Sequence, residues 1–181
     1  SNQTPAPLML RVNTRRGTVA DYQARLQAQG LSSQPFGMAG LLLDQAVPVH
    51  QLPGFAEGDV SVQDASAQQA AQWLLQARDA QGQLLPALPS GARVLDACSA
   101  PGGKTAHLLE AADLSLLALD TDAQRLVRVQ ETLDRLGLSA QTQAVDAAQT
   151  ALWWDQTPLD AIVLDAPCSA SGIVRRHPDV R

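Results

Sequence analysis

Short apolar runs alternate with longer stretches of helical periodicity in the second half of the chain, and this alternation restricts the fold more than any other feature. Residues 93–97, 114–119 and 161–164 are mainly apolar runs of strand length, and residues 141–145, which are more polar, give a further strand in the same alternation. Residues 104–112 and 122–136 have the spacing of helices, and the second stretch stops at Gly137. The pattern predicts an α/β fold in which helices connect buried parallel strands.

An aspartate stands at the end of each predicted strand. These residues are Asp96, Asp120, Asp146 and Asp165. The ligand crevice of an open α/β sheet lies at the carboxyl ends of its strands, so we expect the four carboxylates to gather along one rim. Each aspartate could equally cap the helix that follows it, and four together favour a shared site.

The first half of the chain lacks this regularity. Residues 8–12 form an apolar run, residues 18–29 have helical spacing before Gly30, and an amphipathic stretch covers residues 66–77. Prolines and glycines break up the apolar pieces between them. We therefore expect a small α+β subdomain over residues 1–89 and a second domain over residues 90–181.

Composition narrows the possible partners. The 181 residues are 45% hydrophobic and carry a net charge of −5, which disfavours unselective binding of nucleic acid over the whole surface. No segment approaches the roughly 18 apolar residues of a membrane helix. Two cysteines are too few for a disulfide framework or a four-ligand zinc site. We expect a cytoplasmic monomer with no metal and no membrane contact.

The turn after the first predicted strand of the second half contains adjacent glycines, Gly102 and Gly103, and the only lysine, Lys104. A helix that begins here would point free N–H groups at an anionic group of a ligand. Gly103, Lys104 and Thr105 match the end of a phosphate-binding P-loop, but Cys98 stands where that motif needs its first glycine. The spacing of a dinucleotide-binding turn is absent too. A nucleotide-binding protein with a degenerate phosphate loop remains the alternative function.

A nucleoside cofactor without phosphates fits the turn better. Asp120 lies 18 residues after Gly102, close to the spacing of about 20 at which a carboxylate accepts hydrogen bonds from ribose hydroxyls. Asp146 would receive the exocyclic amino group of an adenine. S-adenosylmethionine has this combination of diol, adenine, sulfonium and amino acid tail. Cys98 would contribute its backbone, since a lone cysteine is usually a small buried hydrophobe.

Two segments together identify a family resemblance. Asp96-Ala-Cys-Ser-Ala-Pro-Gly-Gly-Lys-Thr105 and Asp165-Ala-Pro-Cys-Ser169 resemble the RNA cytosine-5 methyltransferases, as do Leu10-Arg-Val-Asn13 and Val62-Gln-Asp-Ala-Ser66. The resemblance implies a Rossmann-like S-adenosylmethionine-dependent methyltransferase sheet, with its first four parallel strands present, behind a small α+β subdomain. It implies cofactor contacts from Cys98, Ser99, Ala100, Pro101, Gly102, Gly103, Lys104, Asp120, Asp146 and Asp165, with Arg125 as a weaker addition.

The resemblance also implies a substrate and two catalytic residues. It is closest to members that modify bacterial 16S ribosomal RNA, in which one cysteine attacks C6 of a cytosine, C5 takes the methyl group and a second cysteine helps to release the product. Cys168 matches the releasing cysteine, and Asp165 is placed to hold the base edge or, if protonated, to stabilise charge on the ring. The attacking cysteine follows a later strand in the family. We therefore expect a chain truncated at both ends and inactive alone.

Two small basic groups are candidates for contact with RNA phosphates. One follows Cys168 and consists of Arg175, Arg176, His177 and Arg181. The other consists of Arg11, Arg15 and Arg16. Both groups could equally be solvated loop charges, and the sequence leaves the two alternatives open.

Overall fold

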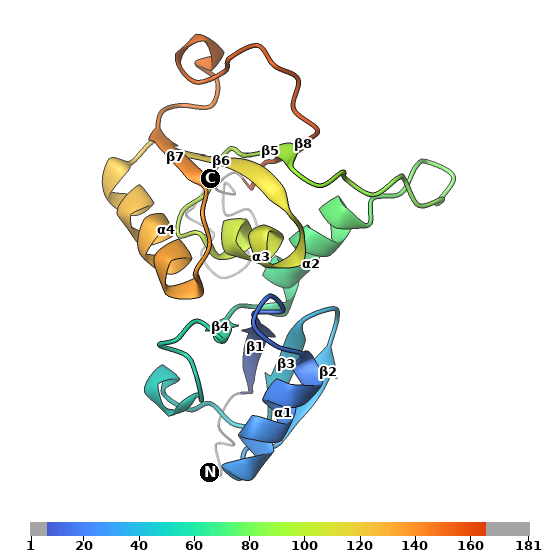
Figure 1. The fold of residues 1–181 in the computed structure, drawn as a ribbon, viewed down its shortest axis with the longest axis vertical. Helices are drawn as coiled ribbons and strands as arrows, with labels where there is room; N and C mark the ends of the chain where they lie inside the picture. The colour runs from blue at the N-terminus through green and yellow to red at the C-terminus, as the bar shows by residue number, and fades with distance from the viewer. Residues whose placement is uncertain (1–6, 166–181) are drawn as a thin grey trace, which may run out of the picture.

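Two four-stranded sheets lie one above the other along the long axis of the molecule (Figure 1). The computed structural model describes residues 7–165. The strands of the N-terminal sheet lie between residues 8 and 62, and those of the second sheet lie between residues 92 and 163. The second sheet has the α/β fold that the alternating pattern predicts.

The N-terminal sheet is antiparallel, with strand order β2-β3-β1-β4. Its strands are β1 (Leu8–Val12), β2 (Ser33–Phe36), β3 (Gly40–Leu43) and β4 (Val60–Val62). Helix α1 (Val19–Ala28) and the short 3-10 helix η1 (Val49–Gln51) complete this half. The helix packs on the sheet through Leu26, which is fully buried with Leu10 and Leu41. β1 and α1 confirm the two elements that the sequence predicts here.

The second sheet is entirely parallel, with strand order β7-β6-β5-β8. Its strands are β5 (Ala92–Asp96), β6 (Leu114–Asp120), β7 (Gln141–Ala144) and β8 (Ala161–Val163). The other elements of this half are α2 (Ala65–Leu75), α3 (Gly103–Ala111), α4 (Ala123–Leu136) and η2 (Thr150–Leu152). Because β5 lies between β6 and β8, the strand order reverses at β5, and such a switch point is where α/β sheets bind ligands.

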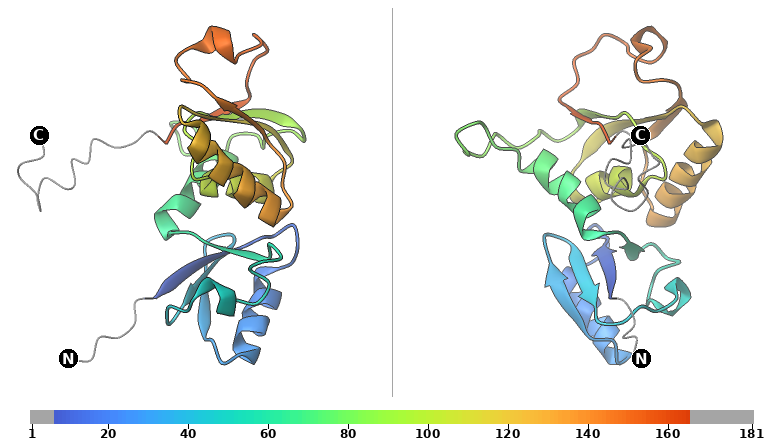
Figure 2. Two further views of the ribbon diagram at one scale, coloured as in Figure 1. Left: turned by 90° about the vertical axis from the view of Figure 1, so that its left-hand side faces the viewer. Right: turned by 180° about the vertical axis from the view of Figure 1, so that it is seen from behind.

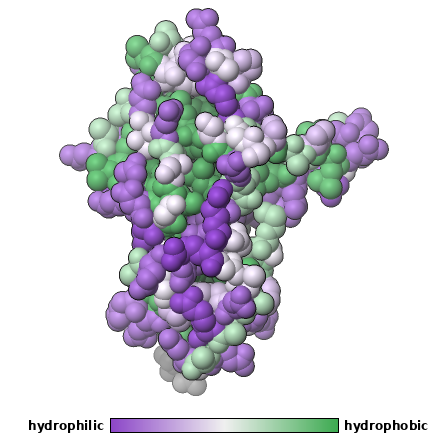
Figure 3. All heavy atoms as spheres, viewed as in Figure 1, coloured by the Kyte–Doolittle hydropathy of each residue, from purple (hydrophilic) through white to green (hydrophobic). Residues whose placement is uncertain are grey.

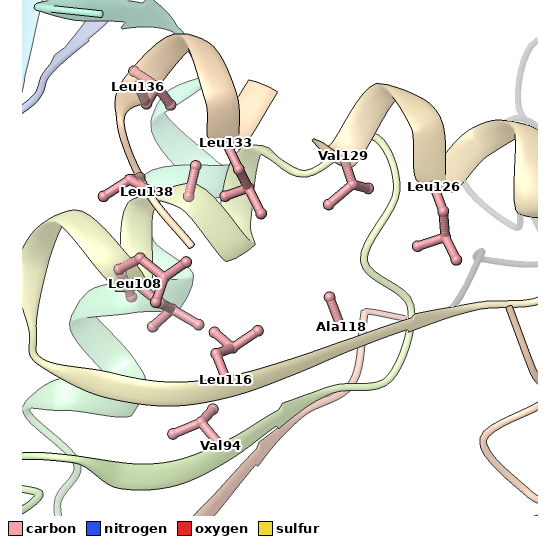
Figure 4. Close-up of a cluster of buried hydrophobic side chains, with 12 residues drawn as sticks. Val94, Leu108, Leu116, Ala118, Leu126, Val129, Leu133, Leu136 and Leu138 are labelled. Carbon is pink, nitrogen blue, oxygen red and sulfur yellow. The ribbon is translucent and has the colours of Figure 1, made fainter. Parts of the chain in front are cut away.

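The two faces of the parallel sheet are buried differently. Figure 4 shows Val94, Leu116 and Ala118 pointing from the strands toward the apolar side chains of α3 and α4, including Leu108 and Val129. A smaller cluster, formed by Leu95, Ala97, Leu119 and Val145 with Trp153 and Leu159, occupies the other face. Figure 2 shows from the side that α3 and α4 lie toward the N-terminal sheet, whereas the segment that connects β7 to β8 lies on the opposite side.

Polar groups join the C-terminal end of α4 to the N-terminal half. The guanidinium of Arg135 donates to the carbonyls of Phe55 and Val60, each at 2.8 Å. The side-chain amide of Asn13 donates to the carbonyls of Gly58, at 3.0 Å, and Leu136, at 3.2 Å. The two halves are therefore joined by specific hydrogen bonds as well as by chain connectivity.

Gly58 has a backbone conformation and surroundings that only glycine suits. Its φ is +88°, and a Cβ would lie 2.2 Å from the carbonyl oxygen of Arg135. We expect Gly58→Ala to lower the free energy of unfolding by about 2 kcal/mol, through backbone strain and the forced separation of the two halves. Urea unfolding measures the loss. Gly82→Ala is the control, because Gly82 has φ +80° with open space around it; equal losses for both variants would contradict the close approach.

The surface differs between the two halves. On the face shown in Figure 3, hydrophobic residues are frequent over the parallel-sheet half, and some lie on the projecting hairpin in which Arg78 pairs with Leu84, whereas the N-terminal half is mainly hydrophilic. Leu84, on the hairpin, is 59% exposed. Within residues 7–165 there is no helix with the length and apolar character needed to cross a membrane.

Candidate functional site

A cavity of about 1130 Å³ opens beyond the carboxyl ends of the parallel strands. It is bounded by the turn after β5, the ends of β6 and β8, and the segment that follows β7. Its lining residues come from sequence positions far apart, and they are Leu95, Ala97, Cys98, Ala100, Asp120, Thr121, Arg125, Asp146, Ala147, Ala148, Thr150, Trp153, Trp154, Leu159, Ile162, Leu164 and Asp165. The fold thus places the cavity at the sheet edge that the sequence indicates.

Three of the four strand-end aspartates, Asp120, Asp146 and Asp165, line this cavity. The expectation that all four gather there is wrong for Asp96, which is 1% exposed and lies behind the turn. Its carboxylate accepts hydrogen bonds from the hydroxyl of Thr105 and, at 3.3 Å, from the backbone N–H of Cys98. Burial raises the pKa of Asp96. This carboxyl group therefore holds the turn against α3 and does not face the cavity.

The turn itself contributes only part of its residues to the cavity wall. Cys98 and Ala100 line the cavity, whereas Ser99 is buried and donates its N–H (2.8 Å) and hydroxyl (3.0 Å) to the carbonyl of Leu119. Pro101, Gly102, Gly103 and Lys104 are not among the lining residues.

Gly102 allows this turn to approach α4. Its φ is +103°, at the N-terminal end of α3, and a Cβ would lie 3.1 Å from the Cα of Val129. An L-residue other than glycine would be strained in that conformation and would crowd the helix. The glycine therefore serves the shape of the turn and its packing on α4.

Asp120 is held in a defined orientation at the end of β6. One carboxylate oxygen accepts from the N–H of Ala100 at 3.3 Å, and the other accepts from the N–H of Asp122 at 3.1 Å. A guanidinium nitrogen of Arg125, a cavity residue, lies 3.8 Å from Asp120. Each carboxylate oxygen has more than one lone-pair site, so Asp120 can still accept hydrogen bonds from a ligand in the cavity.

Lys104 forms an ion pair with Asp165 across the cavity rim. The lysine belongs to the first turn of α3, and the aspartate follows β8. The side chain of Lys104 is 26% exposed and that of Asp165 is 56% exposed. The pair links the two motifs, from residues 96–105 and 165–169, that carry the family resemblance.

Apolar side chains line the cavity together with the acidic residues, and they were not predicted from the sequence. Trp153, Trp154, Leu159 and the exposed Ile162 belong to this apolar wall. The indole N–H of Trp153 donates to the carbonyl of Ala147 at 2.9 Å, which fixes the ring. The available signal was a pair of adjacent tryptophans a few residues after Asp146, in a chain that has only three. Such a wall suits a planar heterocycle.

Cys98 is half-buried in the cavity wall, and its environment opposes ionisation. Burial raises the pKa of its thiol, and the carboxylates of Asp120, Asp96 and Asp165 raise it further. A raised pKa leaves less of the reactive thiolate, so the surroundings of Cys98 disfavour its use as a nucleophile. Cys168, the predicted releasing cysteine, lies outside the described residues, as do Arg175, Arg176, His177 and Arg181.

The three N-terminal arginines do not form a free basic group. Arg11 is 1% exposed and forms an ion pair with Glu110, so both alternatives, phosphate contact and a solvated loop charge, are wrong for it. Arg15 donates to the carbonyl of Ala112 at 2.9 Å, at the C-terminal end of α3. Arg16 pairs with Asp59 at 2.7 Å. Each of these three arginines is therefore bound to a backbone carbonyl or an acidic side chain of the same chain.

Comparison with known proteins agrees with this architecture. The family model described as 16S rRNA methyltransferase RsmB/F matches residues 83–181, and the model described as Methyltr_RsmF/B-like, ferredoxin-like domain matches residues 1–50. The ribosomal RNA small subunit methyltransferase B of Xylella fastidiosa (strain Temecula1) is 55% identical over 97% of the chain, and that of Pseudomonas syringae pv. tomato is 49% identical over 100%.

A solved structure extends the comparison to the fold. A methyltransferase homolog protein from Pyrococcus horikoshii superimposes with a TM-score of 0.77 at 29% identity, covering 97% of this chain and 55% of that chain. The chain spans 39% of the length of each of the two curated relatives above. The extent of the family match, together with the glycine turn and the acidic cavity, shows that the chain belongs to the 16S rRNA methyltransferase RsmB/F family.

Proposed function

We propose that this chain is the cofactor-binding part of an S-adenosylmethionine-dependent methyltransferase that modifies 16S ribosomal RNA. The observation that carries the proposal is that Asp120, Asp146 and the turn residues Cys98 and Ala100 line one cavity. The matched family and the names of the curated relatives support the same substrate class. In this proposal residues 90–181 hold the cofactor, and residues 1–89 form the subdomain that supports them, apart from α2, which packs in the core of the parallel sheet.

The residues around the cavity suit the parts of this cofactor. Asp120, fixed by two backbone N–H groups, would accept the ribose hydroxyls. Asp146 would accept the amino group of the adenine, whose ring would rest against the apolar wall with Trp153. The carboxylates would attract the positively charged cofactor. When bound, the cofactor supplies an electrophilic methyl group, and the chain's residues fix its orientation.

The turn residues would act at the amino acid tail. The start of α3 carries the positive end of the helix dipole, which favours a carboxylate. Cys98 and Ala100 would contact the cofactor from the wall, while Ser99, Pro101, Gly102, Gly103 and Lys104 set the course of the turn. Asp165 would complete the site next to Lys104.

A nucleoside triphosphate such as ATP fits this cavity less well than S-adenosylmethionine does. Three carboxylates line it, and a polyphosphate would meet their negative charge. Calorimetric titration separates the two functions. We expect S-adenosylmethionine to bind and ATP with magnesium to give no heat of binding, whereas the opposite pattern would establish the degenerate phosphate loop.

Asp120→Ala tests the assignment of the ribose. We expect it to weaken the binding of S-adenosylmethionine by about 1–3 kcal/mol, because the two ribose hydroxyls lose their acceptor. Asp134→Ala is the control, since Asp134 is exposed on α4, pairs with Gln130 and lies outside the cavity. Calorimetry measures both dissociation constants. An unchanged constant for Asp120→Ala would show that the carboxylate does not hold the ribose.

We also propose that the modified position is C5 of a cytosine, on the strength of the motifs around Asp165 and Cys168. C5 and C6 are inaccessible in a stacked base, so the target nucleotide would have to be flipped out. Asp165 would face its base edge, and Cys168 would act in product release. The sequence contains only one other cysteine, Cys98, which lies in the cofactor turn and whose thiol pKa is raised by burial. The 181-residue chain should therefore bind the cofactor without transferring its methyl group.

A further inference from the structure

Arg11 belongs to the N-terminal sheet, yet its guanidinium is buried against α3 of the other half. It donates to both carboxylate oxygens of Glu110, at 2.9 and 3.0 Å. Its Nη1 donates to Oε1 of Gln63 at 2.8 Å and to the carbonyl oxygen of Gly103 at 2.9 Å. The side chains of Arg11 and Glu110 are each 1% exposed. Four directed hydrogen bonds therefore converge on one buried group.

The contact with Gly103 connects this group to the cofactor turn. Gly103 is the first residue of α3 and directly follows Gly102, which has φ +103°. The next residue, Lys104, carries the ion pair with Asp165 at the cavity rim. The position of the Gly103 carbonyl thus fixes the peptide group from which Lys104 extends.

The turn is held from its other side by β5. Asp96 accepts from the hydroxyl of Thr105 and from the N–H of Cys98. These bonds restrain Cys98 and Thr105, while Arg11, from a different sheet, restrains Gly103 at the start of α3. The two restraints share no side chain, so removing the guanidinium leaves the Asp96 contacts in place.

Only arginine can make this set of bonds. Its planar guanidinium presents five N–H donors in a fixed fork, so it can bind both oxygens of Glu110 and still reach Gly103. A lysine would keep the charge opposite Glu110, but its compact ammonium group cannot reproduce the fork. Arg11→Lys therefore separates the geometry of the contact from its charge.

We propose that Arg11 is a positioning residue for the cofactor turn, acting through the carbonyl of Gly103 and oriented by Gln63. The N-terminal sheet is then part of the cofactor site, although none of its residues lines the cavity. This inference rests on the proposed binding of S-adenosylmethionine.

The test compares S-adenosylmethionine affinity in three variants by calorimetry, at a temperature where circular dichroism shows each one folded. We expect Arg11→Lys to raise the dissociation constant about tenfold, as for the loss of one well-placed hydrogen bond. Gln63→Met keeps the Arg11 and Glu110 pair and should raise the constant about threefold. Leu26→Ala is the control: Leu26 is fully buried in the N-terminal core, so its truncation destabilises the fold without touching the turn.

Hydrogen exchange distinguishes a positioning role of Arg11 from a general loss of stability. Arg11→Lys should speed amide exchange in residues 98–105, whereas Leu26→Ala should leave that segment at its original rate. If the wild-type protein does not bind S-adenosylmethionine, the proposed function fails. If the wild type binds and Arg11→Lys binds equally well, or if Leu26→Ala weakens binding as much as Arg11→Lys, the positioning role is overturned and the proposed function stands.

Discussion

Arg11→Met should lower the free energy of unfolding by about 3–5 kcal/mol, as is typical when one partner of a buried ion pair is removed. The variant leaves the carboxylate of Glu110 buried, with its residue 5% exposed, and without its counter-charge. It also leaves Gln63 and the carbonyl of Gly103 without the donor that they share. Urea unfolding followed by circular dichroism gives the difference.

Arg16→Met is the matched control for that variant. Arg16 lies five residues further along the chain and also pairs with a carboxylate, that of Asp59, but its side chain is 46% exposed. An exposed pair contributes at most about 1 kcal/mol, so Arg16→Met should have a small effect. If the two variants lose the same stability, the buried pair does not join the halves of the molecule as described.

The stability of the protein should fall as the pH is lowered from 6.5 to 4, and His107 should account for about 3 kcal/mol of that loss. His107 is 3% exposed on α3, and neither ring nitrogen has a hydrogen-bond partner among the described residues. Burial, with the nearby charge of Arg11, lowers its pKa from 6.5 to about 4. In this pH range the imidazole of His107 takes up a proton in the unfolded chain but not in the folded chain. The contribution of His107 to stability is therefore complete above pH 6.5 and is lost as the pH falls toward 4.

His107→Leu isolates this contribution from the other titrating groups. Burial raises the pKa values of Asp96 and Glu110, so these carboxyls favour the folded state as the pH falls and partly mask the histidine. The difference between wild type and variant removes their effect. Unfolding free energies at pH 7 and pH 4.5 give the slope for each protein, and parallel slopes would refute the buried neutral imidazole.

The parallel sheet was predictable because its signals are strong and local. Three of its strands are short, mainly apolar runs, and the polar β7 follows α4 in the same alternation. Helix α4 begins after Asp122, which accepts from the N–H of Gln124, and ends at Gly137. The register of parallel strands then brings Asp120 and Asp146 to the same edge. These features depend on neighbouring residues and on general rules of sheet topology, so they can be read from the sequence.

The N-terminal strands β2, β3 and β4 were not predicted, because they are short and no regular alternation with helices marks them, as it does the equally short β7 and β8. Pro35 lies within β2. An edge strand such as β2 tolerates a proline, but a proline in a sequence argues against a strand.

Other contacts that the sequence did not predict are made between distant residues. Arg11 is buried because Glu110, 99 residues away, meets it in space. Asp96 turns inward because Thr105 supplies a donor. No local pattern indicates either contact.

A crystal structure of the protein with S-adenosylmethionine tests the central claim most directly. We predict that the ribose hydroxyls lie within hydrogen-bond distance of the Asp120 carboxylate and that the adenine lies near Asp146, against Trp153. A cofactor bound elsewhere on the molecule, or bound in this cavity with Asp120 facing away from the ribose, would contradict the account.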